Sequence, residues 1–182
     1  MFADFGFTTG VEVGVEKGKN AQTMFEIIPN LKLYGVDPYQ QHPHASYAYH
    51  AEKRGWNDEY LQNCKAQCLK RMQARNFTLL QGFSEYMADK LEDNSLDFVY
   101  IDGNHDFLNV TQDIHYWLKK VKPGGILAGH DYVRYPSRKF NHVQKVVNAY
   151  TTAYHLLPVF ITMPTDKGLK RDRFRSWFYC KK

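Results

Sequence analysis

Short apolar runs alternate with amphipathic segments along nearly the whole chain, and this alternation leaves few fold classes open. Apolar runs typical of buried strands occupy residues 11–15, 31–37, 77–82, 96–102 and 125–131. The segments between and after them have helical periodicity, at residues 17–28, 57–75, 83–91, 107–121 and 139–150. Strands that alternate with helices predict a parallel sheet that is covered on both faces.

The last part of the chain departs from this alternation. Apolar runs at residues 156–163 and 176–180 flank a basic loop and predict a C-terminal antiparallel hairpin. Right-handed crossovers between the parallel strands then give a doubly wound α/β fold with a mostly parallel, Rossmann-like sheet of about seven strands. A chain of 182 residues is expected to form a single domain, residues 1–182.

The composition excludes several classes of protein. No window approaches the ~20 apolar residues of a membrane span, and the first residues lack the pattern of a signal peptide. Cys64 and Cys68 lie four positions apart in a helical pattern and Cys180 has no partner, which argues against a disulfide framework and against a zinc ribbon. We therefore expect a cytoplasmic protein with reduced thiols and no membrane association.

Small or polar residues follow each of the first five predicted strands. They are residues 14–18, Asp37, residues 82–84, residues 102–105, and His130 with Asp131. In a doubly wound sheet the ligand binds in the crevice outside the carboxyl ends of the strands. The five strand ends therefore predict one binding site at this edge of the sheet.

The first turn, "EVGVEKGKN", limits the choice of cofactor. Gly14 and Gly18 give the spacing G-x-x-x-G, without the middle glycine of a dinucleotide-binding turn. The turn also lacks the Gly-Lys-Ser/Thr ending of a phosphate-binding Walker loop. Instead, an acid-x-Gly-x-x-x-Gly turn followed by an acid at the end of the second strand resembles the class I S-adenosylmethionine-dependent methyltransferases.

The resemblance implies roles for particular residues. Glu12, Gly14 and Gly18 would form the cofactor turn, and Asp37 would accept hydrogen bonds from the ribose hydroxyls of S-adenosylmethionine. The further positions that the resemblance assigns to the cofactor are Phe83 and Ser84, next to the adenine ring, and Asp102. Gly18 also has a simpler interpretation, because a glycine there would let a helix pack closely.

A second block narrows the resemblance. The motifs "IDGNH", "LKKVKPGG" and "GHDY" follow one another in the order found in the O-methyltransferase-like group called methyltransferase family 24. The resemblance covers residues 11–131, and it implies the class I methyltransferase fold with the last strand antiparallel beside the fifth. Only ten residues precede the first predicted strand, so we expect no counterpart of the N-terminal helices that many relatives have.

Asp102, His105 and Asp131 are the candidate catalytic and metal-binding residues. Asp102 and Asp131 end two strands that are expected to be neighbours, and a pair of carboxylates suits a hard cation such as Mg²⁺. In related metal-dependent enzymes a D-x-x-H arrangement supplies the base, which implies His105 here, with Asp102 beside it in catalysis. His130 is a further metal ligand or an orienting neighbour.

Structural interpretations stay open for several of these residues. The residue His105 could be hydrogen-bonded within its own loop, and the enzyme could work without a metal. Capping of the following helix is better assigned to Asp106 or Asn104 than to Asp102. Asp113, inside that helix, is expected at the surface.

Two segments remain. Residues 38–56 are rich in aromatic residues and histidines without a clear period, and we interpret them as a substrate lid, against the alternative of a surface insertion. Residues 166–175 hold much of the net charge of +5 and are interpreted as a solvated loop rather than a patch for an acidic substrate.

The sequence thus predicts an S-adenosylmethionine-dependent methyltransferase that O-methylates a small molecule or a sugar, with Mg²⁺ as an open question. Two alternatives are kept. Some relatives of the group are described as hydroxylases, and the basic loop could bind nucleic acid, although no base-stacking motif supports this. A small-molecule acceptor is the expected partner, and the chain could be a homo-oligomer.

Overall fold

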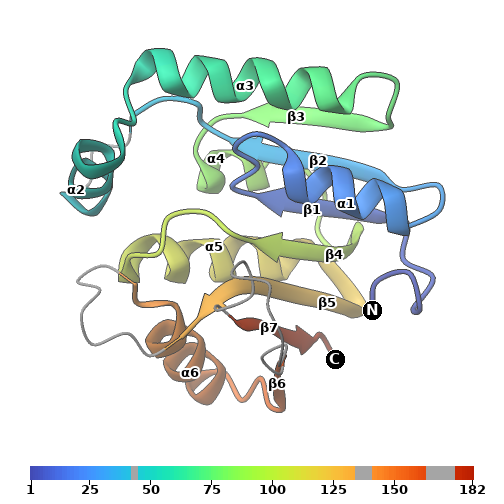
Figure 1. The fold of residues 1–182 in the computed structure, drawn as a ribbon. Coiled ribbons are helices and arrows are strands. Elements are labelled where there is room, and N and C mark those ends of the chain that lie inside the picture. Colours follow the sequence, from blue (N-terminus) through green and yellow to red (C-terminus); the bar gives the residue numbers. More distant parts are fainter. Residues whose placement is uncertain (42–44, 134–140, 163–174) are drawn as a thin grey trace, which may run out of the picture. The chain divides into compact units, whose positions relative to one another are not determined.

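The computed structural model describes residues 1–41, 45–133, 141–162 and 175–182 (Figure 1). The chain divides into two compact units, Met1–Leu91 and Glu92–Lys182. The predicted single domain over residues 1–182 stays a prediction.

The first unit is built on three parallel strands in the order β3-β2-β1. Its elements are β1 (Thr9–Val13), α1 (Lys19–Ile27), β2 (Lys32–Asp37), α2 (Ala45–Arg54), α3 (Asp58–Met72), β3 (Phe77–Gln81) and α4 (Ser84–Ala88). β1 is buried along most of its length, as expected for a strand with side chains packed on both faces. The predicted strands and the helix at residues 57–75 are confirmed to within a few residues.

Helix α2 lies in the segment for which the sequence shows no clear period. Its sequence, ASYAYHAEKR, contains good helix formers such as Ala, Glu, Lys and Arg. Helical propensity without a continuous apolar stripe forms a helix that hydrophobic periodicity does not reveal. The lid segment is therefore partly helical, which the sequence did not predict.

The second unit combines parallel and antiparallel strands in the order β4-β5-β7-β6. Its elements are β4 (Leu96–Ile101), α5 (Phe107–Lys120), β5 (Val121–Tyr132), α6 (Val143–Ala153), β6 (Val159–Ile161) and β7 (Arg175–Cys180). β4 and β5 are parallel, whereas β7 is antiparallel to both β5 and β6. The predicted C-terminal hairpin and the antiparallel last strand beside the fifth are confirmed.

Three details of the second unit differ from the sequence interpretation. β5 already begins at Val121, so the Pro-Gly-Gly segment expected to end the helix belongs to the strand. α6 begins at Val143, and residues 139–140 lie outside the described part. Asp113 is buried, because it faces inward on α5 together with Val110, Ile114 and Trp117.

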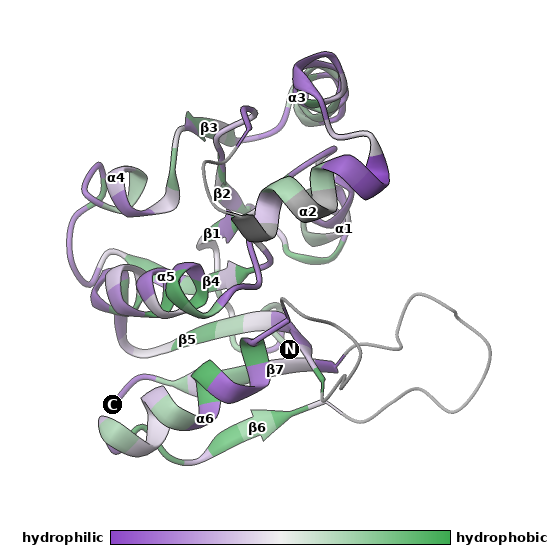
Figure 2. Cartoon of the chain, turned by 90° about the vertical axis from the view of Figure 1, so that its left-hand side faces the viewer, coloured by the Kyte–Doolittle hydropathy of each residue, from purple (hydrophilic) through white to green (hydrophobic). Residues whose placement is uncertain are grey.

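The core of the second unit is formed by apolar side chains from both faces of its sheet. Phe98, Ile126 and Leu127 are fully buried, as are Trp117 and Trp177. Figure 2 shows apolar residues on β6 and along parts of β5 and α6. In the described part of the chain, none of the helices has the length and hydropathy to cross a membrane. The predicted α/β class with a mostly parallel sheet and antiparallel C-terminal strands is confirmed.

Candidate functional site

The strands of the first unit end at a common edge, as the sequence predicts. Asp37 pairs in register with Gln81, at the ends of β2 and β3. The backbone N–H of Gly14 donates to Val36 O over 2.8 Å, and Gly82 N–H donates to Asp37 O over 3.2 Å. Gly14, Asp37 and Gly82 therefore follow three neighbouring strands at the same level of the sheet.

Asp37 is already hydrogen-bonded to the surrounding backbone. Its Oδ2 accepts from Glu16 N over 2.9 Å, and its Oδ1 accepts from Tyr39 N over 2.9 Å. Burial raises the pKa of the Asp37 carboxyl above its ordinary value, and the two backbone hydrogen bonds oppose this by lowering it. Each carboxylate oxygen has a second lone pair, so Asp37 retains the capacity to accept from a ligand diol.

The turn between β1 and α1 is held by a network that the sequence did not reveal. Glu16 lies in the left-handed region, with a φ of 48°. Its carbonyl oxygen accepts from the Tyr39 hydroxyl over 2.7 Å, and its Oε1 accepts from the Tyr60 hydroxyl over 2.7 Å. The ammonium of Lys17 donates to the Tyr60 hydroxyl over 3.0 Å. Glu16 thus has the backbone conformation of a glycine at the place where a dinucleotide turn has its middle glycine.

The other predicted cofactor residues of the first unit lie in or near the same edge. The buried Glu12 accepts from Asn20 Nδ2 over 2.9 Å, which ties β1 to the first turn of α1. Gly18 has a φ of 71°, and a Cβ there would lie 3.1 Å from Cys68 Sγ. The close packing of Gly18 against α3 supports the simpler interpretation of this glycine. Phe83 and Ser84 form the N-cap and the first residue of α4.

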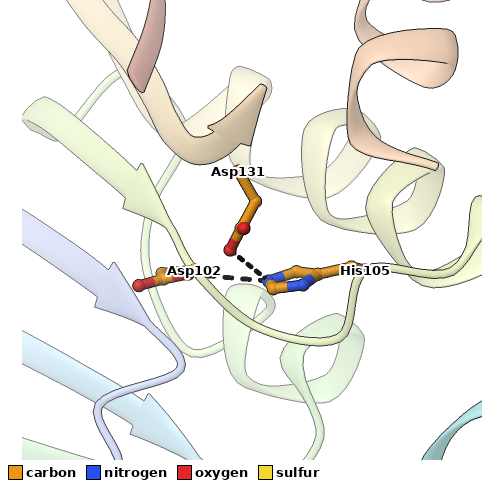
Figure 3. Close-up of side chains that lie close together, drawn as sticks. All are labelled: Asp102, His105 and Asp131. Atoms are coloured by element: carbon orange, nitrogen blue, oxygen red, sulfur yellow. Dashed lines mark ion pairs between the residues drawn. The ribbon is translucent and has the colours of Figure 1, made fainter. Parts of the chain in front are cut away.

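The second unit brings Asp102, His105 and Asp131 together. Ile101 of β4 pairs with Gly129 of β5, so the loop after β4 begins beside the end of β5. The Nε2 atom of His105 lies 3.2 Å from Asp131 Oδ2 and 3.6 Å from Asp102 Oδ1. Figure 3 shows the imidazole of His105 pointing toward both carboxylates. The predicted approach of the two aspartates is confirmed within this unit.

The imidazole of His105 is set between two carboxylates at a partly buried position. Its Nε2 atom is shielded from solvent and lacks an aligned hydrogen-bond partner, although 31% of its side chain is exposed. Burial lowers the pKa of His105, but the interactions with Asp102 and Asp131 outweigh this, so its pKa is raised above the ordinary value. Compared with a free imidazole, His105 therefore holds its proton up to a higher pH.

The donor set of this cluster fits a divalent cation. One nitrogen of His105 and one oxygen each of Asp102 and Asp131 lie within 4.8 Å of one another. Carboxylates suit Mg²⁺ or Mn²⁺, and an imidazole nitrogen without an aligned partner is an available ligand. His130 lies beside this group of three, with Nδ1 3.4 Å from Asp131 Oδ2 and 3.9 Å from Asp102 Oδ1.

The loop that carries His105 ends as the sequence predicts. Asp106 is the N-cap of α5, and its Oδ1 accepts from Asn109 N over 3.0 Å. Asn104 Oδ1 accepts from Asp106 N over 3.2 Å. Asp102 is therefore not needed as a cap and remains available to a ligand.

The predicted lid is only partly described. Tyr47 and Trp56 lie with ring centroids 5.8 Å apart, and Trp56 stacks with Tyr60 at 6.4 Å. The stack joins the end of the segment to α3, and through Tyr60 to the turn that holds Glu16. His42 and His44 lie outside the described residues, as do residues 163–174 with most of the basic loop.

Comparison with known proteins identifies the family. A family model described as "Methyltransferase domain" matches residues 11–132, which include Asp37, Asp102, His105 and Asp131. The chain belongs to this methyltransferase family. The match extends over both units, and the resemblance to the class I S-adenosylmethionine-dependent methyltransferases is confirmed.

Among the proteins similar to this family member is an uncharacterised protein, y4gI, of Sinorhizobium fredii. It is 26% identical over 104 residues, which are 55% of this chain and 10% of that protein. The chain thus spans about a tenth of the length of this relative.

Solved structures share the fold at low sequence identity. The O-methyltransferase TomG from Streptomyces achromogenes, involved in tomaymycin synthesis and solved in complex with S-adenosylmethionine, is 16% identical with a TM-score of 0.62. The similarity covers 100% of this chain and 76% of TomG. Precorrin-6y C5,15-methyltransferase from Geobacter metallireducens is 18% identical, with a TM-score of 0.62 over 96% of this chain and 82% of that one. Both similarities support the methyltransferase fold.

Proposed function

We propose that this methyltransferase uses S-adenosylmethionine to methylate a hydroxyl group of a small molecule or a sugar, with a divalent cation as an aid. The cluster of Asp102, His105 and Asp131 is the observation that carries the proposal. Methylation of a hydroxyl requires removal of its proton, and this cluster combines a proton acceptor with two carboxylates that suit a cation.

The first unit would hold the cofactor. Asp37 would accept hydrogen bonds from the ribose hydroxyls, and Gly14 would let the backbone approach the methionine part, while Gly18 would allow α1 to begin close to α3. Glu12 would support the turn through Asn20, while Phe83 and Ser84 would lie next to the adenine. The proposal is supported by the existing hydrogen bonds to Asp37, which fix its carboxylate in one orientation.

The second unit would prepare the acceptor. Methyl transfer from a sulfonium is an in-line displacement, in which positioning of the nucleophile supplies much of the catalysis. When bound, a divalent cation would lower the pKa of the acceptor hydroxyl. Asp102 and Asp131 would hold it, with His130 as a tentative further ligand, and His105 Nε2 would take the proton of the hydroxyl.

His105 lies near enough to both carboxylates to serve as a metal ligand instead of a base. The variant His105→Ala separates the two roles. As a base, His105 contributes to turnover and little to metal affinity. As a ligand, its loss weakens Mn²⁺ binding together with turnover.

Calorimetry with S-adenosylhomocysteine tests the cofactor site. We expect binding by the wild type and a loss of at least ~10-fold in affinity in Asp37→Ala, because the ribose diol would lose its acceptor. Asp89→Ala changes an exposed aspartate at the end of α4 and is the matched control. Equal affinities of wild type and Asp37→Ala would refute the cofactor placement.

The role of residues 38–56 as a substrate lid is supported only by aromatic contacts and by the place of the segment in the chain. Tyr47 lies against Trp56, which stacks with Tyr60 of α3, and the segment begins directly after Asp37. Alanine at both positions should raise the KM for the acceptor while leaving the affinity for S-adenosylhomocysteine nearly unchanged. An unchanged KM would remove the lid from the proposal.

A further inference from the structure

A histidine outside the cluster makes two hydrogen bonds to the loop that carries His105. His142 is the N-cap residue of α6, but its side chain makes no hydrogen bond to its own helix. The ring instead faces the start of α5, where Nδ1 accepts from Phe107 N–H over 3.0 Å. The backbone N–H of His142 donates to His105 O over 2.8 Å.

These two bonds hold the main chain on both sides of Asp106. One ends on the carbonyl of His105 and the other on the amide of Phe107, so both the position and the direction of the loop are fixed. The hydrogen bond from Asp106 N to Asn104 Oδ1 adds a third anchor within the loop. The backbone position of His105 therefore depends on hydrogen bonds to His142, at the start of α6.

The bond to Phe107 also completes the N-terminus of α5. The first amides of a helix have no partner within the helix and need acceptors from outside it. Asp106 supplies one to Asn109, and His142 supplies one to Phe107. This bond uses Nδ1 of His142 as the acceptor, so it requires the tautomer that carries the proton on Nε2.

We propose that His142 is a positioning residue for His105: it holds the loop so that His105 Nε2 points between Asp102 and Asp131. The proposal rests on the proposed role of this cluster in metal binding and proton transfer. The Phe107 amide is near solvent, so water can replace the lost acceptor at little cost in overall stability. The main effect of losing His142 should therefore be on the geometry of the cluster.

Substitutions at position 142 test the ring contact. His142→Asn keeps an acceptor at the place of Nδ1, whereas His142→Leu removes it. In the presence of EDTA, the NMR signals of the His105 ring should shift in His142→Leu and stay near their wild-type positions in His142→Asn. Amide exchange at Phe107 should accelerate only in the leucine variant. The exposed His155, changed to Asn, is the control, because asparagine suits its φ of 54°.

A backbone substitution tests the same bond from its other side. Phe107→Pro removes the donor, and proline is well tolerated at the first position of a helix. The preceding residue, Asp106, has a φ of −75° and a ψ of 164°, which is compatible with a following proline. Phe107→Ala loses the ring but keeps the N–H, and so isolates the effect of the amide.

Calorimetry with Mn²⁺ gives the functional consequence. We expect His142→Leu and Phe107→Pro each to weaken Mn²⁺ affinity by about 10-fold, and the double variant to be little worse than either. His142→Asn and Phe107→Ala should stay within about 3-fold of the wild type. The proposal would be overturned if the losses of Mn²⁺ affinity added up in the double variant. It would also be overturned if the NMR signals of the His105 ring were unshifted in both His142→Leu and Phe107→Pro.

The readouts also separate this proposal from the proposed function. If the wild type binds no Mn²⁺, the metal site fails, and the position of the His105 ring still decides the role of His142. In that case a shift of the His105 signals in His142→Leu and Phe107→Pro, but not in the controls, supports it. The absence of that shift refutes it.

Discussion

Glu16 donates its backbone N–H to Asp37 Oδ2 over 2.9 Å, and this bond joins the glycine turn of the first unit to the acid at the end of β2. The same acid is expected to bind the ribose of the cofactor. Asp37 therefore both holds the turn and offers its remaining lone pairs to a ligand. The turn would be in place before the cofactor arrives, which reduces the entropy lost on binding.

The backbone of Glu16 leads to a prediction about stability. A non-glycine residue in the left-handed region costs about 1–2 kcal/mol, and a β-branched residue there is worse. Glu16→Gly and Glu16→Val both lose the carboxylate that Tyr60 contacts, so the difference between them isolates the backbone. In urea denaturation, the free energy of unfolding should be higher for Glu16→Gly than for Glu16→Val by at least ~1 kcal/mol.

The same pair of substitutions at Glu26 provides the control. Glu26 lies in α1, where glycine is the poorer helix former, so valine should be the more stable of the two by a few tenths of a kcal/mol. The order of the variants should thus reverse between positions 16 and 26. The same order at both positions would show that the turn does not require its left-handed conformation.

Local patterns were enough to predict most of the fold. The strands, the helices at α3 and α5 and the cap at Asp106 follow from hydrophobic periodicity and from residues near one another in the sequence. The ends of the fourth and fifth strands indicated Asp102 and Asp131, and the resemblance implied His105. The parallel pairing of β4 and β5 brings the three together.

Contacts between distant residues were not predictable in this way. Tyr60 meets Glu16 and His142 meets Phe107 only after the chain has folded, because helices in different parts of the sequence come together. Neither pair has a spacing or a motif that marks it. The positive φ of Glu16 was equally hidden, since glutamate is not a residue that favours this region.

His105 should titrate above the ordinary histidine range in the metal-free protein. Burial lowers its pKa, but the carboxylates of Asp102 and Asp131 raise it, so the pKa lies above the ordinary value of 6.5. A histidine with a raised pKa contributes stability that is complete below pH 6.5 and is lost as the pH rises through its folded-state pKa. Asp131→Asn should lower this pKa, and asparagine suits the φ of 58° at this position.

An NMR titration of the histidine rings in EDTA measures this shift directly. His105 is expected to titrate above pH 6.5 in the wild type, and its pKa should fall in Asp131→Asn. If the His105 pKa is the same in both proteins, the carboxylate of Asp131 does not act on the imidazole as the geometry indicates.

Gly35 in β2 should not tolerate a side chain. A Cβ at this position would lie 2.4 Å from Phe77 Cζ and 2.8 Å from Val15 Cγ2. Gly35→Ala is expected to lower the free energy of unfolding by about 1–3 kcal/mol, as in other overpacked cores. The smaller Phe77→Leu should relieve the clash, so that the double variant loses less than the sum of the single losses.

Gly82 differs from Gly35 in the neighbour that an added side chain would meet. A Cβ there would lie 2.7 Å from Met87 Cε, the far end of a flexible side chain that can move aside. Gly82→Ala should therefore cost less than Gly35→Ala in the same urea denaturation experiment. Equal costs at the two glycines would argue that flexibility of the neighbour does not decide the penalty.

Lys181 stabilises the C-terminal end of α5. Its ammonium donates to Val121 O over 2.7 Å, to Leu118 O over 3.0 Å and to Asn94 Oδ1 over 2.9 Å. The last carbonyls of a helix lack partners within the helix, and a positive charge there also interacts favourably with the helix dipole. Lys181→Met keeps the length of the side chain but removes all three donors.

We expect Lys181→Met to lower the free energy of unfolding by about 2 kcal/mol. This is the range for the loss of hydrogen bonds from a charged group when the acceptors remain in the protein. Lys182→Met removes the same charge from the next, exposed position and should change it by less than about 0.5 kcal/mol. Amide exchange should accelerate in the last turn of α5 only in Lys181→Met. If both variants unfold at the same urea concentration as the wild type, water satisfies these carbonyls equally well, and Lys181 does not act as a cap.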